Sequence, residues 1–155
     1  MTDSTENLQT NEIELLTFRV GDQEYAVDIM SVREIRGWTS ATPLPHAPSF
    51  VRGVINLRGT VLTIVDLSER LGMGTIAVRE RNVIIVVQTA GQNIGLLVDA
   101  VSDILSLPLS ALQPPPEVPS AGSNSFVSAL TIVKDRMVRV LDLNSALPCE
   151  PLEAT

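Results

Sequence analysis

Apolar and polar residues alternate over short stretches of the chain, which is the period of a strand with one buried face. The alternation runs through residues 16–20, resumes through 25–29, and continues on both sides of a turn at Asn56–Thr60. The run Val83–Val87 is apolar at every position, as is typical of a strand covered on both faces. Short strands separated by turns predict a mostly β protein, either small barrels or a sandwich.

Two segments of the chain match two later segments without a gap. Phe18–Ile35 aligns with Val87–Ile104 at an offset of 69, and Phe50–Leu67 aligns with Phe126–Leu143 at an offset of 76. A longer connection in the second half, beginning with Gln113–Pro119, absorbs the difference. Shared alternation alone could produce so faint a similarity. Two matches in the same order favour a structural duplication, with a groove where the two halves meet.

Helical segments are expected to be short. Ser31–Glu34 has the form of a capping box, and Gly37 could end that single turn. Asp66–Glu69 is a second N-cap pattern, ended by Gly72. Neither segment is long enough to change the prediction of a β fold.

Composition and charge argue against several classes of protein, namely nucleic-acid-binding, membrane-spanning and disulfide-bonded proteins. The 155 residues suit one compact unit or two small ones that share a core. There are 18 acidic and 11 basic residues, and six of the acidic ones lie in the terminal segments, so the body is near neutral. A near-neutral body with five aromatic residues argues against nucleic acid as a partner. The longest aliphatic run is far shorter than the ~20 residues that span a bilayer. The single cysteine, Cys149, excludes an internal disulfide.

Patterns for catalysis are weak. The only histidine, His46, lies between two prolines with no nucleophile motif beside it. Asp66 and Asp142 could be paired carboxylates, but their matching places in the repeat and their cap-like contexts favour a structural role. No metal-ligand spacing or phosphate-binding loop is present in the sequence.

Because the patterns for catalysis are weak, we looked for residues that could form a protein-binding surface. The segment Ser31–Trp38 could be a capped turn that places its apolar face in the core. It could also present Glu34 and Arg36 beside an aliphatic surface, as a protein-contact edge. Arg58 lies in a turn, where an arginine is either solvated or, because its planar fork binds carboxylates, part of an interface.

Five motifs in order resemble the chemotaxis coupling protein (CheW) family. They are GDQEYAVDI at Gly21–Ile29, VREIRG at Val32–Gly37, FVRGVINLRG at Phe50–Gly59, IVDL at Ile64–Leu67 and GLLVDAVSDIL at Gly95–Leu105. The resemblance covers residues 14–147 and is closest to the free-standing form of the family.

The resemblance implies two five-stranded SH3-like barrels packed together. The expected boundaries are an acidic tail over 1–13, a first barrel over about 14–72, a second over about 83–147, and a tail over 148–155, with the chain free to cross between barrels. It implies a cytoplasmic adaptor without enzymatic activity or cofactor. The implied partners are the regulatory domain of the histidine kinase CheA and methyl-accepting chemoreceptors, with no membrane insertion.

The resemblance also implies two sets of contact residues. The receptor-binding set is Val32, Glu34, Arg58, Val83 and Ile84. The kinase-binding set is Ile35, Arg36, Gly37 and Trp38, extended to Leu44 and Arg52. The alternative hypothesis is a module that senses a small molecule in the groove between the barrels.

Overall fold

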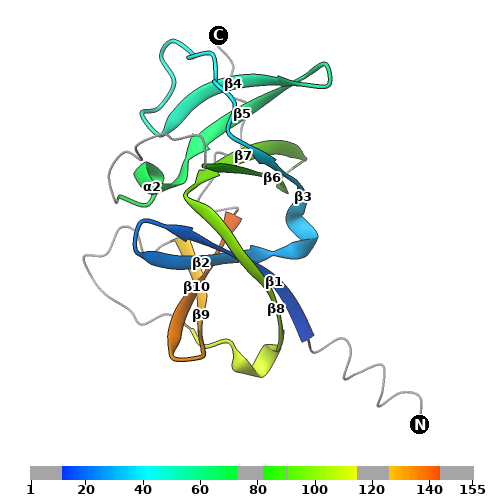
Figure 1. Ribbon diagram of the computed structural model, residues 1–155, viewed down its shortest axis with the longest axis vertical. Helices are drawn as coiled ribbons and strands as arrows, with labels where there is room; N and C mark the ends of the chain where they lie inside the picture. The colour runs from blue at the N-terminus through cyan, green and yellow to red at the C-terminus, as the bar shows by residue number, and fades with distance from the viewer. Residues whose placement is uncertain (1–11, 73–81, 90, 115–125, 144–155) are drawn as a thin grey trace.

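The computed structural model describes residues 12–72, 82–89, 91–114 and 126–143, which form two five-stranded sheets (Figure 1). The strands are β1 (Glu12–Val20), β2 (Gln23–Asp28), β3 (Val32–Gly37), β4 (Val51–Leu57), β5 (Thr60–Asp66), β6 (Val83–Thr89), β7 (Gln92–Val98), β8 (Ala100–Pro108), β9 (Val127–Val133) and β10 (Arg136–Leu141). The helical elements are α2 (Leu67–Arg70) and the single 3-10 turns η1 (Ile29–Ser31) and η2 (Leu109–Ala111). No helix in this part of the chain has the length and apolar character needed to cross a membrane.

The two sheets are called barrel A and barrel B. Barrel A has the strand order β8-β1-β2-β10-β9, and barrel B has the order β3-β6-β7-β5-β4. In Figure 1 barrel B lies above barrel A. The mostly β prediction with two five-stranded SH3-like barrels is confirmed.

The strands do not sort into two contiguous stretches of the chain, and the crossing between barrels that the sequence analysis left open occurs. Strands β3–β5 of the expected first barrel join β6 and β7, while β1 and β2 join β8–β10. The chain therefore crosses between barrels twice, through η1 after β2 and at the start of β8 after β7. Each five-stranded sheet is thus built from strands of both halves, and β8 and β9 of barrel A and β3 and β4 of barrel B remain at the sheet edges.

Strand pairing agrees with the predicted duplication. Adding five to each strand number of barrel A converts its order into that of barrel B, counting past β10 back to β1. The parallel pair Arg139–Tyr25 of barrel A corresponds to Thr63–Ile94 of barrel B under the two sequence offsets. The β1–β8 and β3–β6 pairs also carry their register shifts at matching positions. The gapless alignment thus reproduces even the irregularities of the backbone.

The hydrophobic core has three parts. The largest joins both barrels and includes Leu16, Phe18 and Val27 from barrel A with Ile85 and Leu96 from barrel B. Each barrel also has its own interior. Barrel B contains Ile55, Leu57, Leu62, Ile64, Ile84, Val86 and Leu97, and barrel A contains Leu15, Ala26, Val138 and Val140. The shared core makes the barrels one packed body.

The segment after β2 differs from its prediction. The expected capped turn at Ser31–Glu34 is wrong, because Val32–Gly37 is the strand β3, paired with β6. The helical turn comes earlier, at η1, where the carboxylate of Asp28 accepts a hydrogen bond from the amide of Met30 at 3.0 Å. Strand pairing along β6 outweighs the local capping pattern, since each ladder bond satisfies a backbone group that a single turn leaves open.

Other local predictions can be compared in the same way. The N-cap of α2 is confirmed, since the Asp66 carboxylate accepts from the amide of Glu69. Glu12 and Ile13, expected in the N-terminal tail, lie in β1 opposite β8. The rest of that tail, the C-terminal tail with Cys149 and most of the long connection after Gln113 lie outside the described residues.

Candidate contact surface of barrel B

Strand β3 forms one edge of barrel B and carries most of the predicted contact residues. It pairs with β6 on one side, and its residues alternate between half-buried and exposed. Val32, Glu34 and Arg36 are half-buried, whereas Ile35 keeps 47% of its surface exposed. An edge strand with an exposed isoleucine and half-buried charges is suited to protein contact.

Two arginines surround Glu34. Arg58 Nη2 lies 2.5 Å from Oε1 of Glu34, and Arg36 Nη1 lies 3.2 Å from Oε2. The hydrogen bonds from Arg58 and then from Arg36 lower the pKa of Glu34, and the same contact raises the pKa of Arg58. The carboxylate therefore stays ionised and links β3 to the β4–β5 hairpin.

The turn between β4 and β5 holds Arg58 in an uncommon conformation. Arg58 and Gly59 have φ values of 53° and 84°, as a two-residue type I′ hairpin requires. Asn56 Oδ1 accepts a hydrogen bond from the amide of Gly59 at 2.8 Å. Glycine or asparagine usually fills the first turn position, so an arginine there costs about 1 kcal/mol. Its side chain is 69% exposed, so the guanidinium that binds Glu34 also remains in contact with solvent.

The structure brings four of the five predicted receptor-binding residues to accessible positions. Val32 and Val83 are half-buried near opposite ends of the β3–β6 pair, and Glu34 and Arg58 form the ion pair described above. Ile84 is the exception, because it is fully buried in the interior of barrel B. Its position in the contact set is corrected: it supports β3 from beneath and cannot touch a partner directly.

The chain beyond β3 turns back over barrel B. Trp38 and Ala41 pack against the interior of barrel B, and Thr42 exchanges backbone hydrogen bonds with Val54 at 2.8 and 2.9 Å. Gly53 permits this approach, since a Cβ there would lie 2.2 Å from the Thr42 carbonyl oxygen. Leu44 is half-buried in the same loop.

Arg52, the last predicted kinase-binding residue, is engaged inside the protein. Its Nη2 lies 3.2 Å from Oδ2 of Asp66, whose side chain is 1% exposed. A buried carboxylate needs such a partner, so the pair supports the N-cap of α2. Arg36 and Gly37 complete the set, on β3.

One feature of the seam between the barrels was not predicted from the sequence. The guanidinium carbon of Arg70 lies 4.6 Å from the ring centroid of Phe50 and 4.6 Å from that of Phe126. The two phenylalanines are equivalent in the repeat, and that recurrence was the available signal. Nothing in the sequence indicated that a single arginine would lie between them.

Two surface cavities adjoin these elements. One of about 320 Å³ lies between β1, β8 and η1, and one of about 330 Å³ lies between the segment after β3 and the β4–β5 hairpin. The first is lined by barrel A and the crossover η1, and the second by barrel B and the loop after β3. Neither cavity has strands of both barrels in its wall, as the sensing hypothesis requires. Within the described ranges, no three histidine, cysteine or acidic side chains come together as metal ligands, and His46 is exposed in a loop.

Comparison with known proteins gives one consistent result. The family model for the CheW-like domain matches residues 14–148. The chain is 51% identical to the chemotaxis protein CheW of Rhizobium meliloti over 99% of both chains, and 34% identical to that of Klebsiella aerogenes over 90% of this chain and 84% of the other.

A solved structure agrees with the sequence comparison. The scaffolding protein TtCheW of Thermoanaerobacter tengcongensis superposes with a TM-score of 0.81 at 30% identity, covering 89% of this chain and 95% of that one. The resemblance seen in the sequence is thereby confirmed at the level of both sequence and fold. The chain belongs to the CheW-like domain family and is a coupling adaptor of chemotaxis signalling.

Proposed function

We propose that this adaptor joins the cytoplasmic tips of methyl-accepting chemoreceptors to the regulatory domain of the histidine kinase CheA, and so lets receptors control autophosphorylation of the kinase. The observation that carries the receptor part is the ion pair of Glu34 and Arg58 beside the exposed edge of β3. Lys134 has a similar positive φ at the equivalent turn of barrel A, so the feature that distinguishes Arg58 is its ion pair with Glu34.

The receptor surface combines apolar and charged groups. Val32 and Val83 offer half-buried aliphatic contact, and Glu34 and Arg58 supply opposite charges close together. An amphipathic helix could lay its apolar side on the valines while its polar side chains exchange partners with the ion pair. Rim charges of this kind select orientation more than they add affinity.

The kinase surface lies at the adjoining part of barrel B. Ile35 and Gly37 are exposed on β3, and Trp38 and Leu44 are half-buried in the returning loop. The kinase regulatory domain would pack on these apolar groups, and Arg36 and Arg52 would flank them. No cofactor or metal enters the proposal, and the adaptor works in the cytoplasm at receptor arrays without inserting into the membrane.

Both contacts are expected to be small and individually weak. Transient signalling interfaces bury about 1,200 Å² or less, and the surfaces described here comprise a few side chains each. An array of many receptors and kinases would then be held together by multivalency.

The test compares Arg58→Glu with the matched variant Lys134→Glu. Lys134 is the equivalent first residue of the β9–β10 turn and also has a positive φ, of 51°. We expect Arg58→Glu to weaken capture of a receptor cytoplasmic fragment at least about tenfold, because two carboxylates would then repel each other at the contact. Kinase capture and the melting temperature should change little, and Lys134→Glu should leave all three measurements near the wild-type values.

A second arm of the same experiment uses Trp38→Ala. We expect it to weaken capture of CheA more than capture of the receptor. Unchanged receptor capture by Arg58→Glu, accompanied by a lower melting temperature, would contradict the proposed receptor surface. Equal losses toward both partners with Trp38→Ala would identify Trp38 as a core residue.

A further inference from the structure

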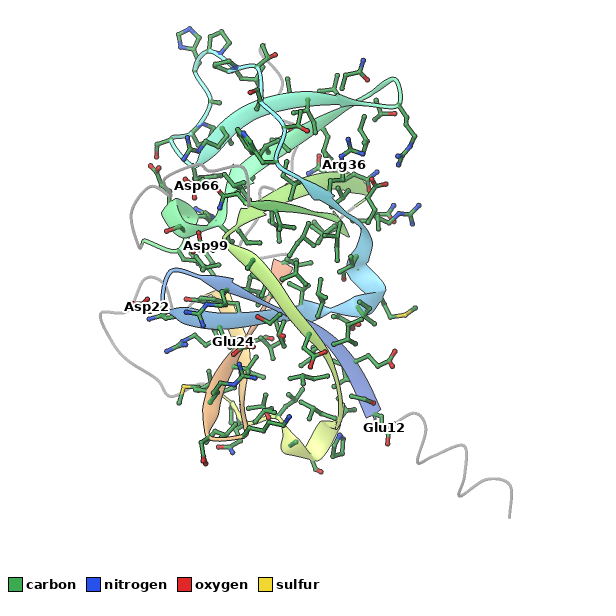
Figure 2. The ribbon with its side chains drawn as sticks, viewed as in Figure 1. Glu12, Asp22, Glu24, Arg36, Asp66 and Asp99 are labelled. Carbon is green, nitrogen blue, oxygen red and sulfur yellow. The ribbon has the colours of Figure 1, made fainter. Side chains whose placement is uncertain are left out.

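Arg70 lies at one side of the seam between the barrels, where it contacts Phe50 and Phe126. The residue ends α2, which lies at the left edge of the seam in Figure 1, while η1 and β3 lie on the right. In Figure 2 the labelled residues mark the two sides, with Asp66 beside α2 and Arg36 at β3. The helix that carries Arg70 therefore lies on the side of the seam opposite β3, next to the Arg52–Asp66 pair.

Each ring that flanks Arg70 is fixed to a different barrel. Phe50 immediately precedes β4 of barrel B, and its carbonyl accepts the amide of Asp66 at 2.7 Å. Phe126 immediately precedes β9 of barrel A, and its carbonyl accepts the amide of Asp142 at 2.7 Å. A guanidinium held by both rings consequently connects one barrel to the other.

The contact differs in kind from the rest of the seam. The shared core consists mainly of aliphatic side chains, and hydrophobic attraction has no preferred direction. Stacking of a planar cation on a ring does have a preferred geometry, and both distances are well within the ~6 Å range of cation–π attraction. The shared core holds the barrels together by apolar contact, and Arg70 adds two cation–π contacts across the seam.

Duplication alone does not explain the arginine. The two phenylalanines are repeated, but the position equivalent to Arg70 in the second half is Ala146. One half supplies the cation for a pair of rings that comes from both. The helix that carries it is held firmly, because Leu67 and Leu71 on either side are buried in the shared core.

We propose that Arg70 is a positioning residue for the receptor-facing surface, through a Phe50–Arg70–Phe126 clamp that sets the angle between the two barrels. The part that concerns receptor affinity rests on the function proposed above. The part that concerns the barrel angle does not. Loosening the clamp would let the angle between the barrels vary. Val32 and Val83 pack against the shared core, so a change in that angle would move the support beneath the two valines that a receptor helix must meet.

The test measures inter-barrel distance directly. Spin labels at Thr60→Cys in barrel B and Ser110→Cys beside barrel A, in a Cys149→Ser background, report the distance distribution by pulsed electron resonance; both labelled sites are exposed. We expect Arg70→Met to broaden or shift the distribution and to weaken receptor-fragment binding by about three- to tenfold. Arg70→Lys should recover part of both effects, because it keeps the charge but loses planar stacking.

The matched control is Arg139→Met. Arg139 lies 5.8 Å from the ring of Tyr25 within barrel A, so this variant removes a cation–π contact that does not cross the seam. It should leave the distance distribution unchanged. If Arg70→Met does not fold, Phe126→Leu removes one ring of the clamp and serves in its place.

The outcomes separate the two proposals. An unaltered distance distribution in Arg70→Met, or equal broadening in Arg139→Met, would overturn the positioning role even if the melting temperature falls. If the wild-type chain fails to bind the receptor fragment, the proposed function is wrong, and the spin-label distances still decide whether Arg70 sets the barrel angle.

Discussion

The two barrels have the same backbone and different interiors. Strand order, register and bulges correspond, yet barrel B encloses seven large aliphatic side chains while barrel A has Leu15, Ala26, Val138 and Val140. Where barrel B has Val86 and Ile55, barrel A has the buried threonines Thr17 and Thr131. Hydrogen-bonded backbone was thus retained through the duplication while the interior side chains diverged. The barrel with more large aliphatic side chains in its interior carries the candidate contact surface.

The turns of the two equivalent hairpins also share a backbone conformation and differ in their side chains. Both β4–β5 and β9–β10 turn through two residues with positive φ, Arg58–Gly59 in one and Lys134–Asp135 in the other. In barrel B the turn arginine bonds Glu34 on β3. In barrel A the equivalent acid, Asp103, accepts a hydrogen bond from the amide of Ile104 at 2.7 Å. The backbone geometry of the two turns is thus similar, but only the turn of barrel B carries the ion pair to which we assign partner selection.

The largest expected difference between the barrels concerns Gly53, which aligns with Ala129 of barrel A. A methyl group at Gly53 would lie 2.2 Å from the Thr42 carbonyl oxygen, and its φ of 141° is strained for any other residue. Steric displacement and backbone strain of ~1–3 kcal/mol each predict that Gly53→Ala lowers the free energy of unfolding by about 4 kcal/mol. Urea denaturation measures this change, and hydrogen exchange at Thr42 and Val54 locates it.

The reciprocal variant is the control. Ala129→Gly in barrel A should cost only about 0.5–1 kcal/mol, the usual entropic penalty of glycine in a strand. A Gly53→Ala protein as stable as the wild type would mean that the returning loop moves freely. The proposal that this loop presents Trp38 and Leu44 at a fixed place would then fail.

A second comparison uses one substitution in both interiors. Leu62 of barrel B and Leu15 of barrel A are both buried, but Leu62 has more large aliphatic neighbours in its cluster. Truncating leucine to alanine costs ~2–5 kcal/mol according to how well the surroundings collapse. We expect about 4 kcal/mol for Leu62→Ala and about 2.5 kcal/mol for Leu15→Ala in denaturant unfolding. Equal costs, or a larger cost at Leu15, would show that the two interiors are equally well packed.

Two features of the fold could be predicted from the sequence. The alternation of apolar and polar residues predicted the strands, and the internal repeat predicted which strands are equivalent. The offsets of 69 and 76 correctly pair Tyr25 with Ile94 and Thr63 with Arg139, because residues that face the same core repeat together. Which strands the two halves exchange could not be predicted from the sequence. Alternation determines which face of a strand is buried, and it carries no information on which of two similar edges the strand joins.

The contact surface was predictable only in part. Glu34 and Arg58 are 24 residues apart, and their sequence contexts suggested a role for each without indicating that they form an ion pair. Ile84 could not be separated from Val83 by pattern, since an all-apolar strand hides which residue reaches the surface. Arg70 was missed because its two aromatic partners come from different barrels.

The smallest expected effect concerns the pH dependence of the Glu34 ion pairs. The hydrogen bonds from Arg58 and Arg36 lower the pKa of Glu34 in the folded protein below the ordinary glutamate value of about 4.3. A lowered folded-state pKa contributes stability that is fully present above the unfolded value and is lost as the pH falls through the folded one. The contribution should therefore be constant at neutral pH and disappear only in acid, and it should be small because the pair is exposed.

Carboxyl chemical shifts in a pH titration test this expectation. In Arg58→Ala we expect the pKa of Glu34 to rise toward its ordinary value, because the first of its two hydrogen-bond partners is gone while Arg36 remains. Lys134→Ala, at the equivalent turn of barrel A, should leave the Glu34 titration where it is in the wild type. A Glu34 titration that is the same with and without Arg58 would show that the ion pair does not persist in solution. Glu34 and Arg58 would then not be paired before a partner binds. The preorganised ion pair beside β3, which distinguishes barrel B from barrel A, would not exist.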